Sequence, residues 1–292
     1  MNLNHLTGLT LFSCLATPLP FVYGAEYPAA KPIRMVVPFA PGGSSDVVGR
    51  LVGNPMAVTL KQTIIVDNRA GAGGTIGADI VAKAAPDGYT ILLVDALHIV
   101  SPIFNRNTLY DPVKDFTPIA MIAKSPVFLG VHPNYSAKSV ADLVALAQKE
   151  PGKVSAGIPG SGNIPLEMLK LRAKIRLNMV PYKGGAPAVN DLVAGNINTM
   201  FATIATYGGF VKAGRIRLLA TSGPERHSDF PDLPTFAQAG YPGVEYEQWF
   251  GMLAPAKLPV PIGAKLGLAI ADALKESDVR ERLLRLSLDP YY

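Results

Sequence analysis

Five consecutive residues between a predicted strand and a predicted helix are suited to binding an anion. They are Gly42, Gly43, Ser44, Ser45 and Asp46. Unpaired N–H groups in the first turn of a helix carry a partial positive charge, so they can bind a carboxylate without an arginine. Glycines let such a ligand approach the main chain closely. We therefore predict an anion-binding turn here; the alternative is that Ser45 or Asp46 only caps the helix.

A second glycine-rich segment contains Gly73 and Gly74, again between a predicted strand and a predicted helix. A rival interpretation is a dinucleotide-binding fingerprint, with Gly71 and Gly73 as its first glycines and Asp95 as its acidic residue. The spacing does not fit, because the third glycine of the fingerprint would fall at position 76 and the chain has Gly77 instead. We therefore predict no nucleotide and no other cofactor.

A third glycine-rich segment lies in the second half of the chain and consists of Gly160, Ser161, Gly162 and Asn163. If the two halves form two lobes, this segment can supply donors from the opposite wall of a cleft. Ligand pockets often lie between domains, and closure of two lobes about a hinge removes a small anion from water.

Residues for catalysis are sparse by comparison. Beyond the first 24 residues the histidines are His98, His132 and His227. No pair of histidines or cysteines has metal-ligand spacing, and no nucleophile-elbow motif occurs, so we predict neither a metal site nor an enzyme. The alternative from another class is a secreted hydrolase that uses Ser44 or Ser161 with Asp46, although no neighbouring base is evident.

The first 24 residues contain no Lys, Arg, Asp or Glu and include an apolar stretch at positions 9–22. Such a segment is typical of a secretory signal peptide, here residues 1–24, so we expect a mature chain that begins near Ala25 in the periplasm. The single cysteine, Cys14, lies inside this segment. The mature chain therefore has no thiol for disulfide, metal or nucleophilic chemistry.

The net charge of the chain is +5, with 27 Lys and Arg against 22 Asp and Glu. A basic chain favours anionic partners. Because the basic residues are scattered and no aromatic and basic recognition motif occurs, we predict a small anionic organic ligand and no nucleic acid. We expect a monomer.

Short apolar segments alternate with amphipathic segments along the chain, a pattern typical of βαβ units. The predicted strands are 33–39, 63–67, 90–94, 127–131 and 154–157, and the predicted helices begin near Asp46 and Thr75, span 140–149 and 166–173, and include Asp191. We predict an α/β fold of two lobes, each a mostly parallel sheet flanked by helices. Lobe 1 would comprise 25–126 plus 225–292, and lobe 2 would comprise 127–224.

Several motifs resemble, in order, those of the Bug family, the receptor components of tripartite tricarboxylate transporters. They are Pro38-Phe39-x-Pro41-Gly42-Gly43-x-x-Asp46, Asp67-Asn68-Arg69-x-Gly71-Ala72-Gly73-Gly74-x-x-Gly77, Pro86-Asp87-Gly88-Tyr89-Thr90, Tyr110-Asp111-Pro112, Pro181-Tyr182-Lys183-Gly184-Gly185 and Pro231-Asp232-Leu233-Pro234-Thr235. The resemblance covers nearly the whole mature chain.

This resemblance implies a Venus-flytrap fold without catalytic residues and membrane transporter subunits as partners. It also implies a carboxylate-bearing ligand in the cleft, typically a di- or tricarboxylate, an acidic amino acid or an aromatic carboxylate. A related role, in which the receptor signals to a sensor kinase, stays open. By the same resemblance, the first wall of the site would contain residues 42–46 with Gly73 and Gly74. The second wall would contain residues 160–163, Lys183, Gly184 and Thr203.

The chain departs from the family pattern at three places. The helix after the third glycine segment is shorter and lacks a histidine that many members have. Asp95 stands where members more often have a small or uncharged residue; in the cleft its charge would favour a ligand with an ammonium group. The family pattern also continues with a further helix beyond Tyr292, so a chain ending there would be a truncated member.

Overall fold

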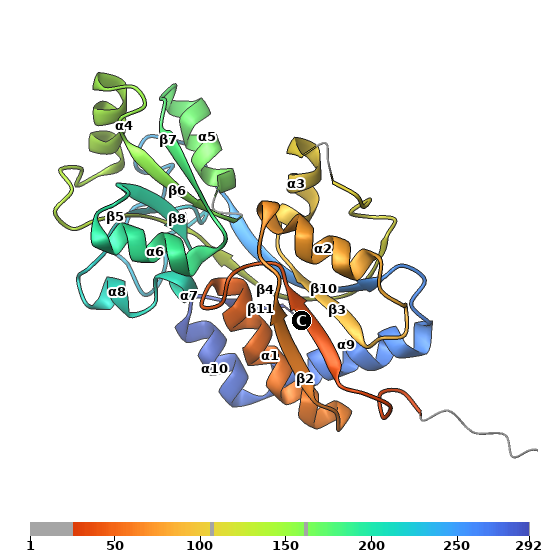
Figure 1. Ribbon diagram of the computed structural model, residues 1–292. Helices are drawn as coiled ribbons and strands as arrows, with labels where there is room; N and C mark the ends of the chain where they lie inside the picture. The colour runs from red at the N-terminus through yellow and green to blue at the C-terminus, as the bar shows by residue number, and fades with distance from the viewer. Residues whose placement is uncertain (1–25, 106–107, 161–162, 292) are drawn as a thin grey trace, which may run out of the picture.

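The protein has two lobes, seen in Figure 1 as a red-to-yellow and blue lobe and a green-to-cyan lobe. The structure is a computed structural model, and it describes residues 26–105, 108–160 and 163–291. The predicted signal peptide and two of the predicted ligand-binding residues, Ser161 and Gly162, lie outside the described residues.

Within these residues the first lobe contains a sheet with the strand order β11-β4-β10-β3-β1-β2. Its strands are β1 (Ile33–Val37), β2 (Ile64–Asn68), β3 (Thr90–Val94), β4 (Phe116–Pro126), β10 (Glu247–Pro255) and β11 (Asp289–Pro290). Its helices are α1 (Ser44–Leu60), η1 (Ala72–Gly74), α2 (Thr75–Ala82), α3 (Leu97–Phe104), α9 (Val260–Lys275) and α10 (Ser277–Arg285). β1 pairs in parallel with β2 and β3, whereas β10 runs antiparallel to β3 and β4.

The second lobe contains a sheet with the order β7-β6-β8-β5-β9. Its strands are β5 (Phe128–Val131), β6 (Ser155–Pro159), β7 (Asn178–Tyr182), β8 (Thr199–Ala202) and β9 (Arg217–Thr221). Its helices are α4 (Val140–Lys149), α5 (Asn163–Ala173), α6 (Gly185–Ala194), α7 (Ile204–Tyr207) and α8 (Gly209–Lys212). The predicted two-lobed α/β fold is confirmed. Each sheet is mixed rather than mostly parallel, because the strands that carry the chain between the lobes pair antiparallel to their neighbours.

Burial on both faces of β1 shows why apolar runs in this sequence form central strands. Side chains alternate between the faces of a strand. Ile33, Met35 and Val37 point into the core under α1, while Val36 points into the cluster under α2. When helices cover both faces of a strand, its sequence is a continuous run of apolar residues. This pattern is typical of a sheet inside an α/β lobe.

The two lobes are joined by crossovers that meet at Ser222. β4 ends at Pro126 and β5 begins at Phe128, so the first crossover is a single residue, Val127. The Val127 N–H donates to Ser222 Oγ at 3.0 Å, and Ser222 Oγ donates to the carbonyl of Tyr246, just before β10. The buried serine therefore ties both connections together, which makes this point the natural hinge between the lobes.

The return from the second lobe to the first was predicted at residue 225. Phe236 and Val244 belong to the apolar core of the second lobe, and β10 begins only at Glu247. The domain boundaries stay a prediction, and this packing favours a return near Glu247.

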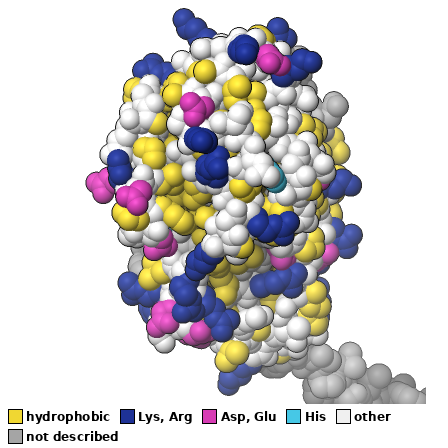
Figure 2. Space-filling view, turned by 90° about the vertical axis from the view of Figure 1, so that its left-hand side faces the viewer, with side chains coloured by type: hydrophobic (Ala, Val, Ile, Leu, Met, Phe, Trp, Pro, Cys, Tyr) yellow, Lys and Arg dark blue, Asp and Glu magenta, His cyan; other side chains and the backbone are white. Residues whose placement is uncertain are grey.

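The surface carries its charge in small groups. On the face shown in Figure 2, Lys and Arg side chains are spread out, with Asp and Glu among them, and form no continuous stripe. Among the described residues, no helix combines the length and the apolar character needed to cross a membrane.

Candidate functional site

Two spaces between the lobes bring together most of the predicted ligand-binding residues. The first, here called the inner cavity, is lined by Gly43, Ser44, Ser45, Asp95, Gly160 and Thr203. The second, here called the outer groove, is lined by Gly73, Gly74, Gly160, Asn163, Tyr182 and Lys183. Gly42, Asp46 and Gly184 line neither space.

The two spaces differ in size. The inner cavity has a volume of about 20 Å³, enough for about one water molecule. The outer groove has about 560 Å³. The lobes are therefore closed over the inner cavity, and a ligand larger than water reaches its walls only when the lobes move apart.

Phe39 separates the inner cavity from the outer groove and lines both. A Cβ atom placed on Gly74 of the first lobe would lie 3.5 Å from the ring, and one placed on Gly160 of the second lobe 3.2 Å from it. Because the ring fills the gap between two glycines on opposite lobes, it acts as a partition that follows strand β1.

The N-terminus of α1 faces the inner cavity and is capped from the other lobe. Gly43 is the N-cap residue and supplies no side chain, so neither Ser45 nor Asp46 occupies the N-cap position. The Ser44 N–H donates to Thr206 Oγ1 of the second lobe at 3.1 Å. The N–H groups of Ser45 and Asp46, also in the first turn, have no acceptor within the helix. The predicted donor turn thus lies at the cleft, with one donor used to hold the lobes together.

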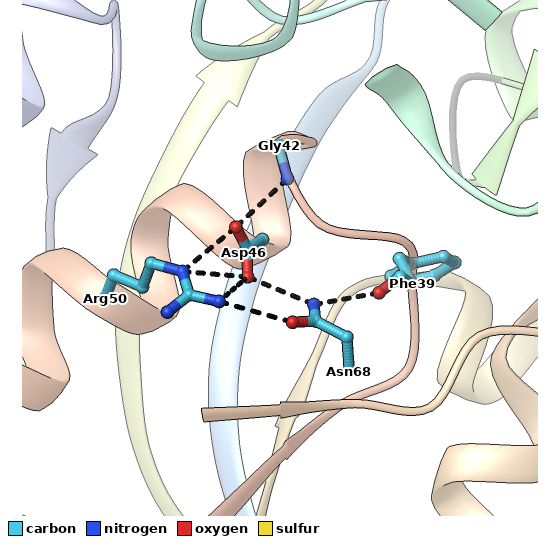
Figure 3. A network of polar contacts seen from close by, with 5 residues as sticks. All are labelled: Phe39, Gly42, Asp46, Arg50 and Asn68. Atoms are coloured by element: carbon cyan, nitrogen blue, oxygen red, sulfur yellow. Dashed lines mark hydrogen bonds and ion pairs between the residues drawn. The ribbon is translucent and has the colours of Figure 1, made fainter. Parts of the chain in front are cut away.

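Asp46 does not line the inner cavity; its side chain organises the loop before α1 (Figure 3). Its carboxylate accepts hydrogen bonds from the Gly42 N–H at 3.0 Å, from Arg50 Nε at 3.1 Å and from Asn68 Nδ2 at 3.0 Å. Asn68 Nδ2 also donates to the carbonyl of Phe39 at 3.0 Å. These contacts hold the loop that carries the partition and the glycines.

The ionisation of Asp46 reflects this role. Burial by itself would raise the pKa of the carboxyl group, but the hydrogen bonds from Arg50, Gly42 and Asn68, with the charge of Arg50, lower it below its usual value. A carboxylate bound on both oxygens in this way is poorly placed to act as a base for Ser44.

Glycines allow the loops of the two lobes to touch. The Ala40 N–H donates to the carbonyl of Lys183 at 2.9 Å. A Cβ atom on Gly184 would lie 2.9 Å from the nitrogen of Ala40, and one on Gly43 would lie 3.2 Å from the nitrogen of Gly185. Any larger side chain at these positions would therefore push the lobes apart.

The outer groove has a different chemistry. Gly74 is the N-cap of α2, and the carbonyl of Gly73 accepts a hydrogen bond from Ser101 Oγ at 2.8 Å. Lys183 is exposed on the opposite lobe, and its ammonium group forms no ion pair with any described residue. The groove thus combines a helix N-terminus with one cationic side chain.

Two buried polar side chains in the inner cavity stand out. Asp95 follows β3 and is 3% exposed, and its Oδ1 accepts the Leu97 N–H at 2.9 Å. Thr203 follows β8 and is 1% exposed, and its Oγ1 has no hydrogen-bond partner among the described residues.

Sequence reasoning missed several residues of the cleft, among them Phe39, Thr206 and Gln248. Phe39 was part of a quoted motif but was not assigned to the site, and Thr206 and Gln248 were not considered. Gln248 comes from β10, and its Nε2 donates to Ser44 Oγ at 3.4 Å. Thr206 lies three residues after Thr203, so it shares a helical face with it, a spacing that the sequence does contain.

The chain is similar to known proteins along nearly its whole length. The family model described as tripartite tricarboxylate transporter family receptor matches residues 48–292. BugT of Bordetella pertussis is 34% identical over 287 residues, which are 96% of this chain and 88% of BugT.

Solved structures agree with this match. MatC (Rpa3494) from Rhodopseudomonas palustris with bound malate is 34% identical and superposes with a TM-score of 0.86, covering 89% of this chain and 90% of MatC. Rpa4515 of R. palustris with adipate is 32% identical, also with a TM-score of 0.86, covering 91% of this chain and 90% of that one. Two lobes, a closed cleft and matches along nearly the whole sequence thus agree: this chain belongs to the tripartite tricarboxylate transporter receptors, the Bug family that its motifs resemble.

Proposed function

We propose that this protein is a periplasmic solute receptor that encloses a small carboxylate-bearing metabolite between its lobes and delivers it to the membrane subunits of a tripartite tricarboxylate transporter. The observation that carries the proposal is the N-terminus of α1, which faces a buried cavity shared by both lobes. The similar structures of MatC with bound malate and of Rpa4515 with adipate support a carboxylate as the ligand.

The chemistry of the first turn of α1 supports carboxylate binding. A helix N-terminus stabilises a negative charge by about 0.3 to 1 kcal/mol, and by about 2 kcal/mol in a partly buried site. Ser45 and Asp46 offer main-chain donors there, and a carboxylate oxygen could also replace Thr206 Oγ1 at the Ser44 N–H. Opening at the Ser222 hinge would admit the ligand, and closing would remove it from water.

We favour binding over hydrolysis for the same space. Among the described residues that line the inner cavity, none is a histidine, and the carboxylate of Asp46 is engaged by Arg50, Gly42 and Asn68. A serine nucleophile needs an adjacent base to take its proton. We propose that the protein acts as a monomer and without a catalytic step.

A thermal-shift screen followed by calorimetric titration tests the proposal. The mature protein would be screened against malate, succinate, glutarate, adipate and citrate, with the matching uncharged diamides as controls. A ligand at 100 times its dissociation constant adds about 2.7 kcal/mol of stability, which raises Tm by several degrees. Stabilisation by carboxylates and not by diamides supports the proposal, whereas no response to any carboxylate contradicts it.

A further inference from the structure

One end of the second lobe carries a cluster of exposed cations, here called the basic patch. It consists of the side chains of Lys149, Lys153, Arg172, Lys174 and Arg176, all of them exposed. Lys149 and Arg172 lie in the last turns of α4 and α5, and the other three lie in the loops that follow these helices. The cluster is thus assembled from two separate segments of the chain.

Two hydrogen bonds hold these segments side by side. The Gly152 N–H donates to the carbonyl of Arg176 at 3.0 Å, and Gln148 Nε2 donates to the carbonyl of Ala173 at 3.3 Å. Figure 2 shows Lys and Arg side chains gathered at the top of the molecule, over the end of the lobe where Figure 1 places α4 and α5. The five cations therefore share one surface.

The basic patch is not neutralised from within the protein. None of its five side chains forms an ion pair with a described residue, whereas the neighbouring Lys170 pairs with Glu167 at 2.8 Å. Residues 149–153 and 171–176 contain these five cations and one acidic residue, Glu150, so they contribute +4 to the net charge of +5.

Stabilisation of helix ends explains only part of this cluster. Cations near a helix C-terminus interact favourably with the helix dipole, which accounts for Lys149 and Arg172. It does not account for the cations in the loops beyond the helices. Because like charges repel one another, such a cluster favours an anionic partner.

The basic patch lies at the end of the lobe opposite the cleft. Strands β6 and β7 pair in parallel; both begin just after the patch, and they end next to Gly160 and Lys183 of the outer groove. Five residues of strand span about 16 Å. A partner on the patch would therefore leave the cleft uncovered and the first lobe free to move.

The chemistry of the patch suits an anionic membrane surface. Phosphate groups of a fluid leaflet can rearrange around long Lys and Arg side chains that have no fixed partner in the protein. Leu171, which precedes Arg172, is 77% exposed. An apolar side chain among cations can enter the boundary between head groups and acyl chains.

We propose that the basic patch binds anionic phospholipid head groups and holds the receptor by its second lobe at the membrane that contains its transporter. The first lobe then opens and closes without leaving the surface. This inference goes beyond the proposed function and does not depend on which ligand the cleft binds.

Co-sedimentation of the mature protein with vesicles tests the inference. One kind of vesicle contains phosphatidylcholine alone, and the other an equal mixture of phosphatidylglycerol and phosphatidylcholine. The patch variant combines Lys149→Gln, Lys153→Gln and Lys174→Gln. The control variant removes three exposed lysines elsewhere, through Lys61→Gln, Lys138→Gln and Lys212→Gln. Each variant changes one lysine with a positive φ, 52° at Lys174 and 50° at Lys61, so effects on the backbone are matched as well.

We expect the wild type to bind the phosphatidylglycerol vesicles about tenfold or more tightly than phosphatidylcholine alone, and the difference to shrink as salt is raised. Each cation near an anionic leaflet strengthens binding about fivefold, so the patch variant should lose about tenfold or more, and the control variant much less. Leu171→Gln should weaken binding about threefold. Both triple variants should keep the carboxylate affinity of the wild type, because their changes lie outside the inner cavity and the outer groove.

Equal binding to the two kinds of vesicle, or equal losses in the two triple variants, would overturn the inference. Binding of polyglutamate that depends on the patch, without binding of vesicles, would also overturn it and would indicate an acidic protein surface as the partner. Each of these results would leave the proposed function in place, since carboxylate binding is measured separately by titration.

Discussion

The inner cavity and the outer groove lie on either side of one phenylalanine, yet they are built in different ways. Main-chain donors of α1, buried hydroxyl groups and one buried carboxylate line the inner cavity, which is closed. The outer groove is wide and has an exposed lysine on its rim. Fixed main-chain groups in an enclosed cavity of low dielectric discriminate strongly between ligand head groups. A solvent-exposed charge at the edge of a groove is screened by salt and discriminates weakly. From this difference we propose that the inner cavity recognises the ligand's head group and that the outer groove accommodates the ligand's length.

The largest effect is expected where the two lobes touch beside the inner cavity. Gly43 has φ of −84° and ψ of 171°, which valine also adopts, but its Cβ would lie 3.2 Å from the nitrogen of Gly185. Gly43→Val should therefore keep the fold and prevent full closure, lowering ligand affinity at least 100-fold, about 2.7 kcal/mol. Calorimetric titration measures the loss, and far-UV circular dichroism checks the fold.

A matched control for this change is Gly209→Val on α8, where an added Cβ has no neighbour within 4 Å. Its affinity should equal that of the wild type. Wild-type affinity in Gly43→Val would show that the direct contact between the loops is not needed for binding. It would contradict the proposal that the inner cavity binds the ligand.

A smaller effect is expected from the partition itself. Phe39→Ala would join the inner cavity to the outer groove, so longer ligands should gain relative to shorter ones. We expect the ratio of adipate to succinate affinity to rise about tenfold, with a loss of about 3 kcal/mol in stability from the removed ring. Titration and chemical denaturation measure the two quantities. An unchanged ratio would mean that the two spaces do not accommodate one ligand.

The smallest effect is expected at the outer rim. Lys183→Met removes the charge and keeps the apolar stem of the side chain. Because exposed charges contribute about 0 to 1 kcal/mol, the affinity for a dicarboxylate should fall about threefold at low salt, and the difference should vanish in high salt. Lys212→Met on α8 is the control. A loss as large as that of Gly43→Val would reverse the assignment of the two spaces.

Much of the fold can be predicted from local sequence patterns. The strand Thr90–Val94 and the helix Val140–Lys149 were predicted with the bounds that the structure has, because apolar periodicity and a serine N-cap define them locally. The long crossover strands β4 and β10 were not predicted. Their residues alternate irregularly, and the register shifts in their pairing reflect contacts with partners distant in the sequence.

In the site, too, local features could be predicted from the sequence, whereas features that depend on distant contacts could not. Glycine-rich loops between strands and helices pointed to both spaces, since a turn of that kind is a local feature. Asp46 was assigned to the ligand, but its carboxylate is engaged by Asn68, which is brought to it only by the pairing of β1 with β2. Thr206 and Gln248 reach the cleft from elements far along the chain, so local patterns held little to identify them.

The central claim is that a ligand is enclosed when the lobes close, and a reversible lock tests it most directly. The only cysteine of the chain is Cys14, and a Cβ on Gly42 would lie 3.2 Å from Cβ of Ala186, a few tenths of an ångström less than the roughly 3.5 to 4.5 Å of a disulfide, so a bridge between these positions would hold the lobes almost closed. Because Gly42 has a φ of 82°, which strains a cysteine, the reduced double variant would first be checked for its fold and for ligand affinity. Gly42→Cys with Ala186→Cys would be loaded with an isotope-labelled carboxylate from the screen, oxidised, and assayed for release. The account predicts that the oxidised protein retains the ligand and releases it on reduction. Equally fast release from the oxidised and reduced forms would contradict it.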